Sequence, residues 1–280
     1  MAIDKTMFAD FLHEHPFQPA TALWRAVEVA EVARRSLPQG RGLDLGCGDG
    51  KLTNILLART GLRDLVGVDL DPNETQEAKS YQFYSAIHTA PAHEIPEPAS
   101  SFDFVFSNSV LEHIDPVEPV LHEVARILKP GGRFIFTVPT SSFHACLRGP
   151  LIPGANTEKY LDDLDERCAH RNYFGAERWR EVLAKHGLRL EVAAEYLNKQ
   201  EVRRWETISR FTAGILYGAF NKRKHPIEIQ RSLKLRGNGI TLPKILAVPL
   251  ATLLSFGVTN RETVVNGCLY IEGFREPLGQ

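Results

Sequence analysis

The sequence is poor in cysteine, with four residues in a chain of 280. No two cysteines form a CxxC pair, and no cluster of histidines lies beside them at the spacing of metal ligands. The pattern argues against a disulfide framework and against a zinc site, and we expect no metal ion. The four residues are Cys47, Cys146, Cys168 and Cys268.

Long hydrophobic runs are scarce as well. The first ten residues include Asp4, Lys5 and Asp10 and do not resemble a secretory signal, so we expect a cytoplasmic protein. Residues 245–258 contain no charge, but 14 residues interrupted by Pro249 are too few for a membrane span. This run predicts either a helix that packs in the core or in a homodimer, or a helix that contacts a membrane surface.

Net charge is nearly absent, because 33 basic residues are balanced by 34 acidic ones. The distribution is uneven: residues 198–260 carry eleven Lys or Arg and three Glu, which gives +8 and leaves −9 for the rest. Such a segment suits an anionic partner, either a phosphate-bearing substrate or a membrane surface, although a solvated basic face has the same composition. We do not expect nucleic acid, because aliphatic rather than stacking aromatic residues separate the basic ones.

From residue 41 onward, short apolar runs alternate with helical patterns, which predicts a parallel sheet covered by helices, an α/β fold. Ahead of this alternation, apolar residues at helical spacing follow Thr21, so we expect an N-terminal helix with Thr21 as its cap. Residues 147–165 are rich in Gly and Pro and are expected to form a loop over the substrate entrance. The expected strands are 42–45, 65–70, 102–106, 133–138, 188–196 and 264–274.

This pattern divides the chain into four parts. We expect an N-terminal helical cap over residues 1–40 and a ligand-binding core over residues 41–197. A basic helical insertion follows over residues 198–260, and residues 261–280 form the final strand of the core and a tail. The insertion contains no repeat, so its role is not indicated by its pattern.

A glycine-rich turn, LDLGCGDG over residues 43–50, follows the first expected strand. Glycines at such a turn let backbone N–H groups approach a ligand closely. The sixth position of a dinucleotide fingerprint would be Lys51 rather than glycine, which makes a nicotinamide or flavin nucleotide the weaker candidate. Asp69 lies at the end of the second expected strand, where a carboxylate can accept hydrogen bonds from both ribose hydroxyls of an adenosine.

Four motifs in order resemble class I S-adenosylmethionine (SAM)-dependent methyltransferases: LDLGCGDG, VGVDLDP, SSFDFVFSNSVLEHI and VLHEVARILKPGGRFIFTVP. The resemblance implies a Rossmann-like sheet of seven strands, mostly parallel with the last strand antiparallel, and SAM bound across the carboxyl ends of the first strands. It implies cofactor-binding positions at Asp44, Gly46, Cys47 and Gly48 for the methionyl part, Asp69 for the ribose, Leu70, Ala92 and His93 for the adenine, and Ser107 and Asn108 beneath the sulfonium. One position departs from the pattern, because Pro91 stands where similar sequences often carry an aspartate.

Methyl transfer from a sulfonium depends mainly on alignment of the acceptor, so a general base is optional. If the acceptor is a hydroxyl, His113 is the candidate base, since it follows the fourth expected strand and histidine works as a base near neutrality. A packing role for His113 beside Glu112 is the alternative. His144, His170 and Tyr173 fall in segments expected to cover the acceptor.

We therefore predict a SAM-dependent methyltransferase that acts on a small-molecule acceptor, which we expect to be lipid-linked or glycosylated. Two alternatives stay open at this point. One is a SAM-binding regulatory or scaffold protein without turnover, and the other is a nicotinamide-dependent oxidoreductase. The basic insertion also leaves open a peripheral membrane contact and a homodimer.

Overall fold

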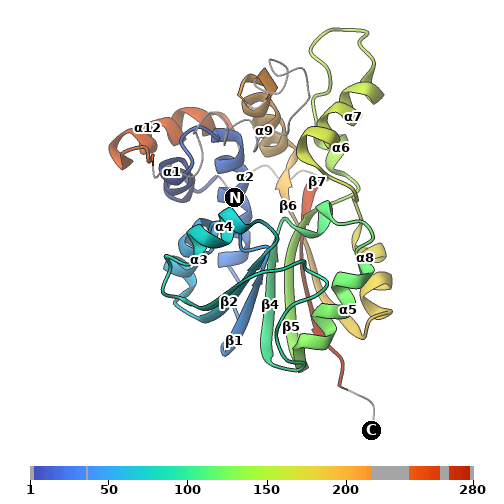
Figure 1. The fold of residues 1–280 in the computed structure, drawn as a ribbon. Helices are drawn as coiled ribbons and strands as arrows, with labels where there is room; N and C mark the ends of the chain where they lie inside the picture. The colour runs from blue at the N-terminus through green and yellow to red at the C-terminus, as the bar shows by residue number, and fades with distance from the viewer. Residues whose placement is uncertain (1–2, 36, 213, 216–239, 259–264, 278–280) are drawn as a thin grey trace. The chain divides into compact units, whose positions relative to one another are not determined.

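The computed structural model describes residues 3–35, 37–212, 214–215, 240–258 and 265–277 (Figure 1). The chain divides into two compact units, which are described separately. The helical unit comprises Met1–Ala30, Ser142–His170 and Leu197–Gly267. The sheet unit comprises Glu31–Ser141, Arg171–Tyr196 and Cys268–Gln280. The predicted domain boundaries at residues 40, 197 and 260 stay a prediction.

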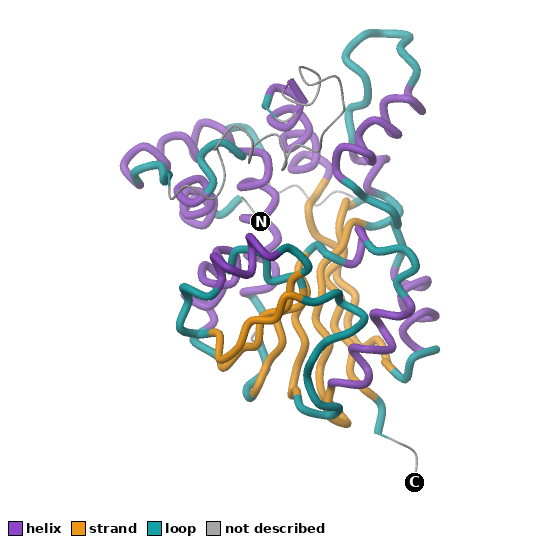
Figure 2. The backbone as a smooth tube through the Cα atoms, viewed as in Figure 1, coloured by secondary structure: helices purple, strands orange, loops and turns teal. Residues whose placement is uncertain are grey.

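The sheet has seven strands in the order β3-β2-β1-β4-β5-β7-β6, drawn as one layer of strands in Figure 2. The pairs β1–β2, β1–β4, β2–β3 and β4–β5 are parallel, whereas β7 runs antiparallel to β5. This topology confirms the predicted Rossmann-like fold with an antiparallel last strand. The strands are β1 Arg41–Leu45, β2 Asp64–Asp69, β3 Tyr84–Thr89, β4 Phe102–Asn108, β5 Leu128–Pro139, β6 Leu188–Asn198 and β7 Asn266–Arg275.

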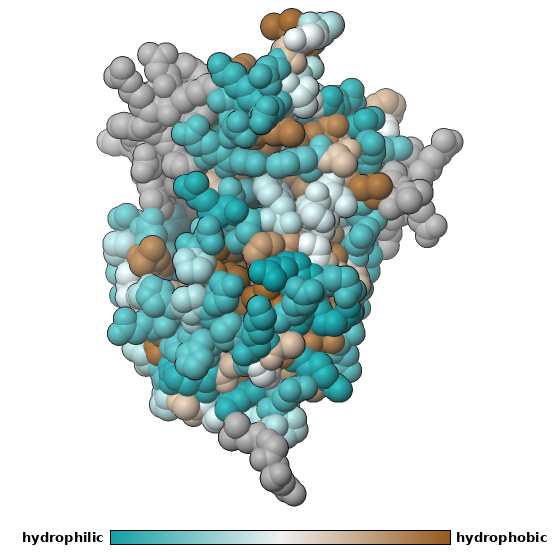
Figure 3. All heavy atoms as spheres, turned by 90° about the vertical axis from the view of Figure 1, so that its right-hand side faces the viewer, coloured by the Kyte–Doolittle hydropathy of each residue, from teal (hydrophilic) through white to brown (hydrophobic). Residues whose placement is uncertain are grey.

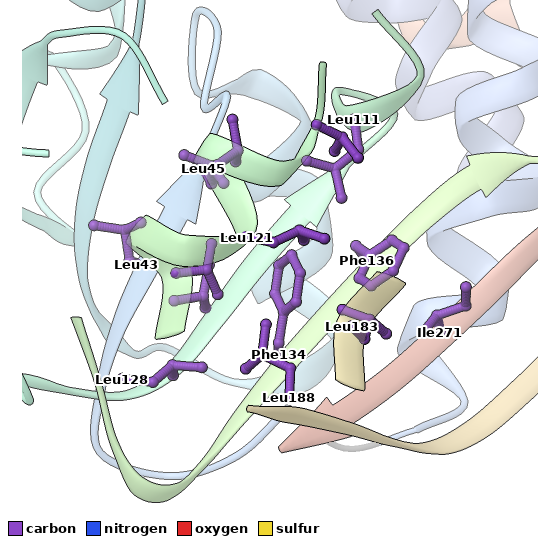
Figure 4. Packing of buried hydrophobic residues seen from close by; sticks show 14 of the residues in the cluster. Leu43, Leu45, Leu111, Leu121, Leu128, Phe134, Phe136, Leu183, Leu188 and Ile271 are labelled. Atoms are coloured by element: carbon purple, nitrogen blue, oxygen red, sulfur yellow. The ribbon is translucent and has the colours of Figure 1, made fainter. Parts of the chain in front are cut away.

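Helices cover the sheet because side chains of a buried strand alternate between its two faces. Leu43 and Leu45 of β1 share one core with the apolar stripes of α5 and α8, as Figure 4 shows for several of these residues. Asp44, between them, points to the opposite face and contacts Thr53 of α3. The helices of this unit are α3 Lys51–Thr60, α4 Pro72–Ala78, the 3-10 helix η1 Leu111–His113, α5 Glu118–Ile127 and α8 Ala176–Ala184.

The helical unit contains α1 Lys5–Glu14, most of α2 Pro19–Ala33, α6 Phe143–Cys146, α7 Thr157–Cys168, α9 Lys199–Phe211 and α12 Lys244–Ser255. Its aromatic core joins three of these helices. The ring centroids of Trp24, Phe143 and Trp205 lie 5.2 to 5.7 Å apart in edge-to-face arrangements. Such pairs add stability beyond the apolar area they bury.

A buried carboxylate holds the loop after α6 against α9. The carboxylate of Glu206 accepts hydrogen bonds from the N–H groups of Arg148 (2.6 Å) and Gly149 (3.2 Å). It also accepts from the hydroxyl of Tyr160 (2.5 Å) and from the guanidinium of Arg210 (2.9 Å). Four donors on one buried carboxylate compensate the cost of removing its charge from water.

Two sequence predictions for this unit are wrong in detail, and one of its helices has no counterpart among the predicted elements. Thr21 is not a cap, because α2 begins at Pro19, a residue suited to the first helical turn. The helix α1 was not expected at all. Residues 147–165 are not entirely a loop, because α7 starts at Thr157, where the side chain of Asn156 accepts the N–H of Lys159 (3.0 Å).

The predicted basic insertion is only partly described. Its first helix, α9, begins with a capping box. The side chain of Asn198 accepts the N–H of Glu201, and the side chain of Glu201 accepts the N–H of Asn198. The uncharged run over residues 245–258 forms α12 and the turn that follows it. The basic cluster at residues 221–224 lies outside the described residues.

Candidate functional site

The glycine turn leaves β1 through backbone conformations that favour glycine. Gly46, Gly48 and Gly50 have φ values of +78°, +53° and +80°. A Cβ atom at Gly46 would lie 2.3 Å from a methyl group of Val110, so a side chain there would clash. At Gly48 the nearest atom would be Glu74 Oε2 at 3.8 Å, which leaves the turn open beside this residue. No side chain crowds the turn at Gly48, and the binding of a ligand there stays a prediction.

Asp69 connects this turn to the end of β2. Its Oδ2 atom accepts the N–H of Gly48 and its Oδ1 atom accepts the N–H of Asp71, both at 2.9 Å. Partial burial raises the pKa of Asp69, while these two N–H donors act in the opposite direction. Each carboxylate oxygen has a second lone pair, so the side chain can still accept the ribose hydroxyls assigned to it.

The N–H groups of Gly46 and Cys47 both donate to the carbonyl of Val68, at 2.8 and 3.0 Å. These bonds hold the start of the turn against β2. Burial raises the pKa of the Cys47 thiol far above its ordinary value, which keeps it protonated. The side chain of Cys47 is buried within the turn, and its predicted contact with the cofactor stays a prediction.

Asp44 is nearly inaccessible, and its carboxylate is engaged by protein donors. Oδ2 accepts the hydroxyl groups of Thr53 at 2.6 Å and Tyr84 at 2.5 Å. Burial raises the pKa of Asp44 to about 6, against the lowering effect of these two hydrogen bonds. The prediction placed Asp44 beside the methionyl part of the cofactor, and the structure adds that it joins β1 to α3 and β3. Sequence reasoning did not identify Thr53 or Tyr84.

The positions predicted for the adenine lie beyond β2 and β3. Leu70, directly after Asp69, is 71% exposed, which is high for a large apolar side chain at the edge of a sheet. Ala92 packs against the core, and His93 is exposed. An exposed leucine beside a carboxylate and an open glycine turn fits a nucleoside, because a base can cover the leucine while the ribose bonds to the carboxylate.

The end of β4 carries the next predicted residues. Ser107 is fully buried and donates its hydroxyl to the carbonyl of Leu45 at 3.0 Å, so it connects β4 to the end of β1. Asn108 is also buried. After β4, η1 presents His113 at the surface, with Nε2 3.9 Å from Oε1 of the buried Glu112.

The segment that follows α7 fixes η1 in place. The carbonyl of Glu112 accepts the N–H of Arg171 at 2.7 Å. The side-chain amide of Asn172 donates to the carbonyls of Leu111 (3.2 Å) and Ile114 (2.8 Å). Asn172 thus positions the turn that carries His113. No motif marked Asn172, because the bond joins positions about sixty residues apart.

The three predicted acceptor residues do not share one compact unit. His144 and His170 belong to the helical unit, where Nε2 of His144 lies 2.9 Å from Oδ1 of Asp165. The ring of His170 lies 6.0 Å from that of Phe143. Tyr173 belongs to the sheet unit and is half-buried. Their role toward an acceptor stays a prediction, as do the cofactor contacts residue by residue.

Residues 22–192, more than half of the chain, match a family model described as a methyltransferase domain. An uncharacterized methyltransferase from Schizosaccharomyces pombe is 30% identical over 182 residues, which is 58% of this chain and 66% of the relative. A ubiquinone biosynthesis O-methyltransferase from Azoarcus sp. is 32% identical over 134 residues, 46% of this chain and 54% of the relative. The chain thus spans between about half and two thirds of these relatives.

A solved structure of an S-adenosylmethionine-dependent methyltransferase from Mesorhizobium loti has a similar fold, with a TM-score of 0.51 at 18% identity over 88% of this chain and 96% of that one. The family match favours S-adenosylmethionine over a nicotinamide nucleotide, in agreement with the open glycine turn and the carboxylate beside it. The cofactor is S-adenosylmethionine, and the chain belongs to the class I SAM-dependent methyltransferases.

Proposed function

We propose that this protein transfers the methyl group of SAM to a small-molecule acceptor that is lipid-linked or glycosylated. The observation that carries the transfer reaction is the convergence of three features at one edge of the sheet. The glycine turn follows β1, Asp69 ends β2, and η1 with His113 follows β4, and these strands are parallel neighbours. Ligands of open α/β sheets bind outside this carboxyl edge.

SAM supplies a methyl group on a sulfonium, which is an already good leaving group, so the protein has mainly to align the acceptor for in-line displacement. Asp69 and the backbone of the turn would hold the cofactor. His113 would accept the proton of an acceptor hydroxyl, and the carboxylate of Glu112, 3.9 Å away, would stabilise the imidazolium that forms. Asn172 would keep η1, and with it His113, in place.

The composition of the helical unit supports a lipid-linked or glycosylated acceptor. Eleven of the thirteen large apolar side chains exposed in the described chain belong to this unit. Residues 198–260 carry a charge of +8. Apolar and cationic surface together suit a molecule with a hydrophobic part and an anionic part. The relative from Azoarcus sp. is named an O-methyltransferase, which supports a hydroxyl as the methylated group.

The proposal includes a cytoplasmic location with peripheral membrane contact through residues 198–260. A homodimer through the same residues is the alternative use of this surface. Its uncharged run, which forms α12, suits either partner.

The test is methyl transfer from SAM labelled in its methyl group to a cell extract separated into lipid-soluble, glycosylated and other water-soluble fractions. We expect label in the lipid-soluble or the glycosylated fraction, and at least about tenfold less label with the Asp69→Ala variant at a SAM concentration below the native dissociation constant. Label confined to other water-soluble molecules would contradict the proposal that the acceptor is lipid-linked or glycosylated. SAM binding without label in any fraction would favour a regulatory or scaffold protein instead.

A further inference from the structure

The helix α12 places its small residues inside and its large apolar residues outside. Ala247, Ala251 and Ser255, spaced by four, are buried where α12 packs against α1. The residues that surround this stripe are exposed although they are large and apolar. They are Ile245 (81% exposed), Leu246 (56%), Val248 (49%), Leu253 (69%) and, at the end of the helix, Phe256 (77%).

This pattern reverses that of an ordinary surface helix, which directs apolar side chains to the core and charged ones to water. No charged residue occurs between 245 and 258, so nothing but Thr252 interrupts the outer face. By contrast, the view that faces α5 and α8 is mainly hydrophilic, with apolar residues in small separate patches (Figure 3). A contiguous apolar face of this kind marks a contact with a partner or a membrane.

Positive charge lies at both ends of this face. Lys244 opens the helix, and its amine pairs with Asp10 at 3.0 Å while the side chain is 68% exposed. At the other end the guanidinium of Arg204 donates to the carbonyl of Phe256 at 2.6 Å. The sequence of residues 216–239, just before α12, holds six Lys or Arg against one Glu. This charge suits an anionic surface and repels a second copy of the same chain.

The length of α12 decides how it could meet a bilayer. Its 12 residues extend about 18 Å at the helical rise, against about 30 Å for the hydrocarbon core. Within the part of the chain that the structure describes, no helix is long and apolar enough to cross a membrane. The helix therefore has the dimensions to lie in the plane of the interface, with its apolar face toward the acyl chains.

We propose that the outer face of α12 docks this protein on an anionic lipid bilayer. The proposal rests on the proposed function only in that a lipid-linked acceptor would be found there. Lys244 and Arg204, at the two ends of this face, would meet the phosphate groups. Ile245, Leu246, Leu253 and Phe256 would insert between the lipids, where their exposed apolar surface leaves water.

The test is flotation of the full chain with vesicles of phosphatidylglycerol and phosphatidylcholine, compared with phosphatidylcholine alone, at low and at high salt. We expect binding to the anionic vesicles that weakens as salt screens the charge. The double variant Ile245→Gln with Leu253→Gln should bind at least about tenfold more weakly. Leu62→Gln is the matched control, because Leu62 is equally exposed (76%) but lies in the sheet unit.

Phe256→Gln, which changes an exposed residue at the end of the helix, provides an independent variant that should also weaken binding. Circular dichroism and urea unfolding check that each variant is folded. No binding of the native chain to anionic vesicles, or equal binding by the double variant, would overturn the proposal. So would a dimer in sedimentation equilibrium that the double variant abolishes while vesicles stay unbound. Vesicle binding together with methylation of water-soluble molecules only would refute the acceptor class and leave the docking face standing.

Discussion

The carboxylate of Asp69 accepts the N–H of Gly48 at 2.9 Å, so the residue that ends β2 also fixes the turn that follows β1. A single side chain thereby sets the distance between the two predicted halves of the cofactor site. Each of its two oxygens accepts one backbone N–H and keeps a second lone pair for a ligand hydroxyl. The glycine turn and Asp69 are thus joined by a direct hydrogen bond, although 20 residues separate Gly48 from Asp69 in the sequence.

Replacing Asp69 by Ala should weaken SAM binding by about 1.5 to 3 kcal/mol, roughly tenfold to a hundredfold, because charge-assisted hydrogen bonds are lost. Isothermal calorimetry with SAM and with its demethylated product measures the change. Asp71→Ala is the matched control: Asp71 caps α4 through its side chain and donates only its backbone N–H to Asp69. Equal affinity of native protein and Asp69→Ala would place the cofactor elsewhere.

The raised pKa of the buried Asp44 leads us to expect that the folding stability depends on pH. Burial raises its pKa from 3.8 to about 6, so the folded protein binds this proton more tightly than the unfolded chain. The stabilisation is complete below pH 3.8 and is lost as the pH rises through about 6. Relative to Asp44→Asn, which cannot titrate here, the native protein should gain at most about 3 kcal/mol as the pH falls across this window.

Urea unfolding at several pH values measures this difference. Tyr84→Phe is a second variant, because loss of the hydroxyl removes a donor that lowers the pKa of Asp44. Its transition should therefore move to higher pH. A difference between native protein and Asp44→Asn that stays constant with pH would mean that the carboxylate is not desolvated as described.

The sequence predicts those parts of the site that are formed by residues close together in the chain. The glycine turn depends on φ values that glycine tolerates, and Asp69 follows a recognisable buried strand. Thr53, Tyr84 and Asn172 could not be predicted in the same way. Their hydrogen bonds join residues that only the folded sheet brings together, and no periodicity marks such partners.

The helical unit was harder to predict because its signals were short or weak. Helix α1 has a cap, Asp4, and buried apolar residues at helical spacing, but its 10 residues form a short and isolated signal. Helix α7 buries only Leu164, and a helix with so small an apolar stripe resembles a polar loop in sequence. In the sheet unit, by contrast, the regular alternation of buried strands and amphipathic helices predicts six of the seven strands. The exception is β3, whose residues are only partly buried.

A substitution at His113 distinguishes a catalytic role of this residue from a packing role. If it is the base for a hydroxyl acceptor, His113→Asn should lower kcat by about a hundredfold or more, while SAM affinity is unchanged. Steady-state kinetics with the acceptor found by labelling and calorimetry with SAM test the two parts. If kcat stays as in the native protein, His113 only packs beside Glu112.

Glu206 gives the last prediction, on the stability of the helical unit. Its side chain is 1% exposed and accepts four hydrogen bonds, one of them from the largely buried guanidinium of Arg210. Removing one partner of a buried ion pair leaves the other charge without compensation, so Glu206→Ala should cost about 3 to 5 kcal/mol. Tyr160→Phe removes a single donor and should cost about 1 kcal/mol. Urea unfolding compares the two variants.

The difference between these two costs shows which of the donors to Glu206 contribute most to stability. Glu206 joins the backbone of Arg148 and Gly149 to α9, so its loss should also release the loop after α6 to limited proteolysis, whereas Tyr160→Phe should keep this loop protected. Equal costs for the two variants would mean that Tyr160, rather than the two backbone N–H groups and Arg210, dominates the network. Because SAM is assigned to the sheet unit, neither change should lower SAM affinity in protein that remains folded.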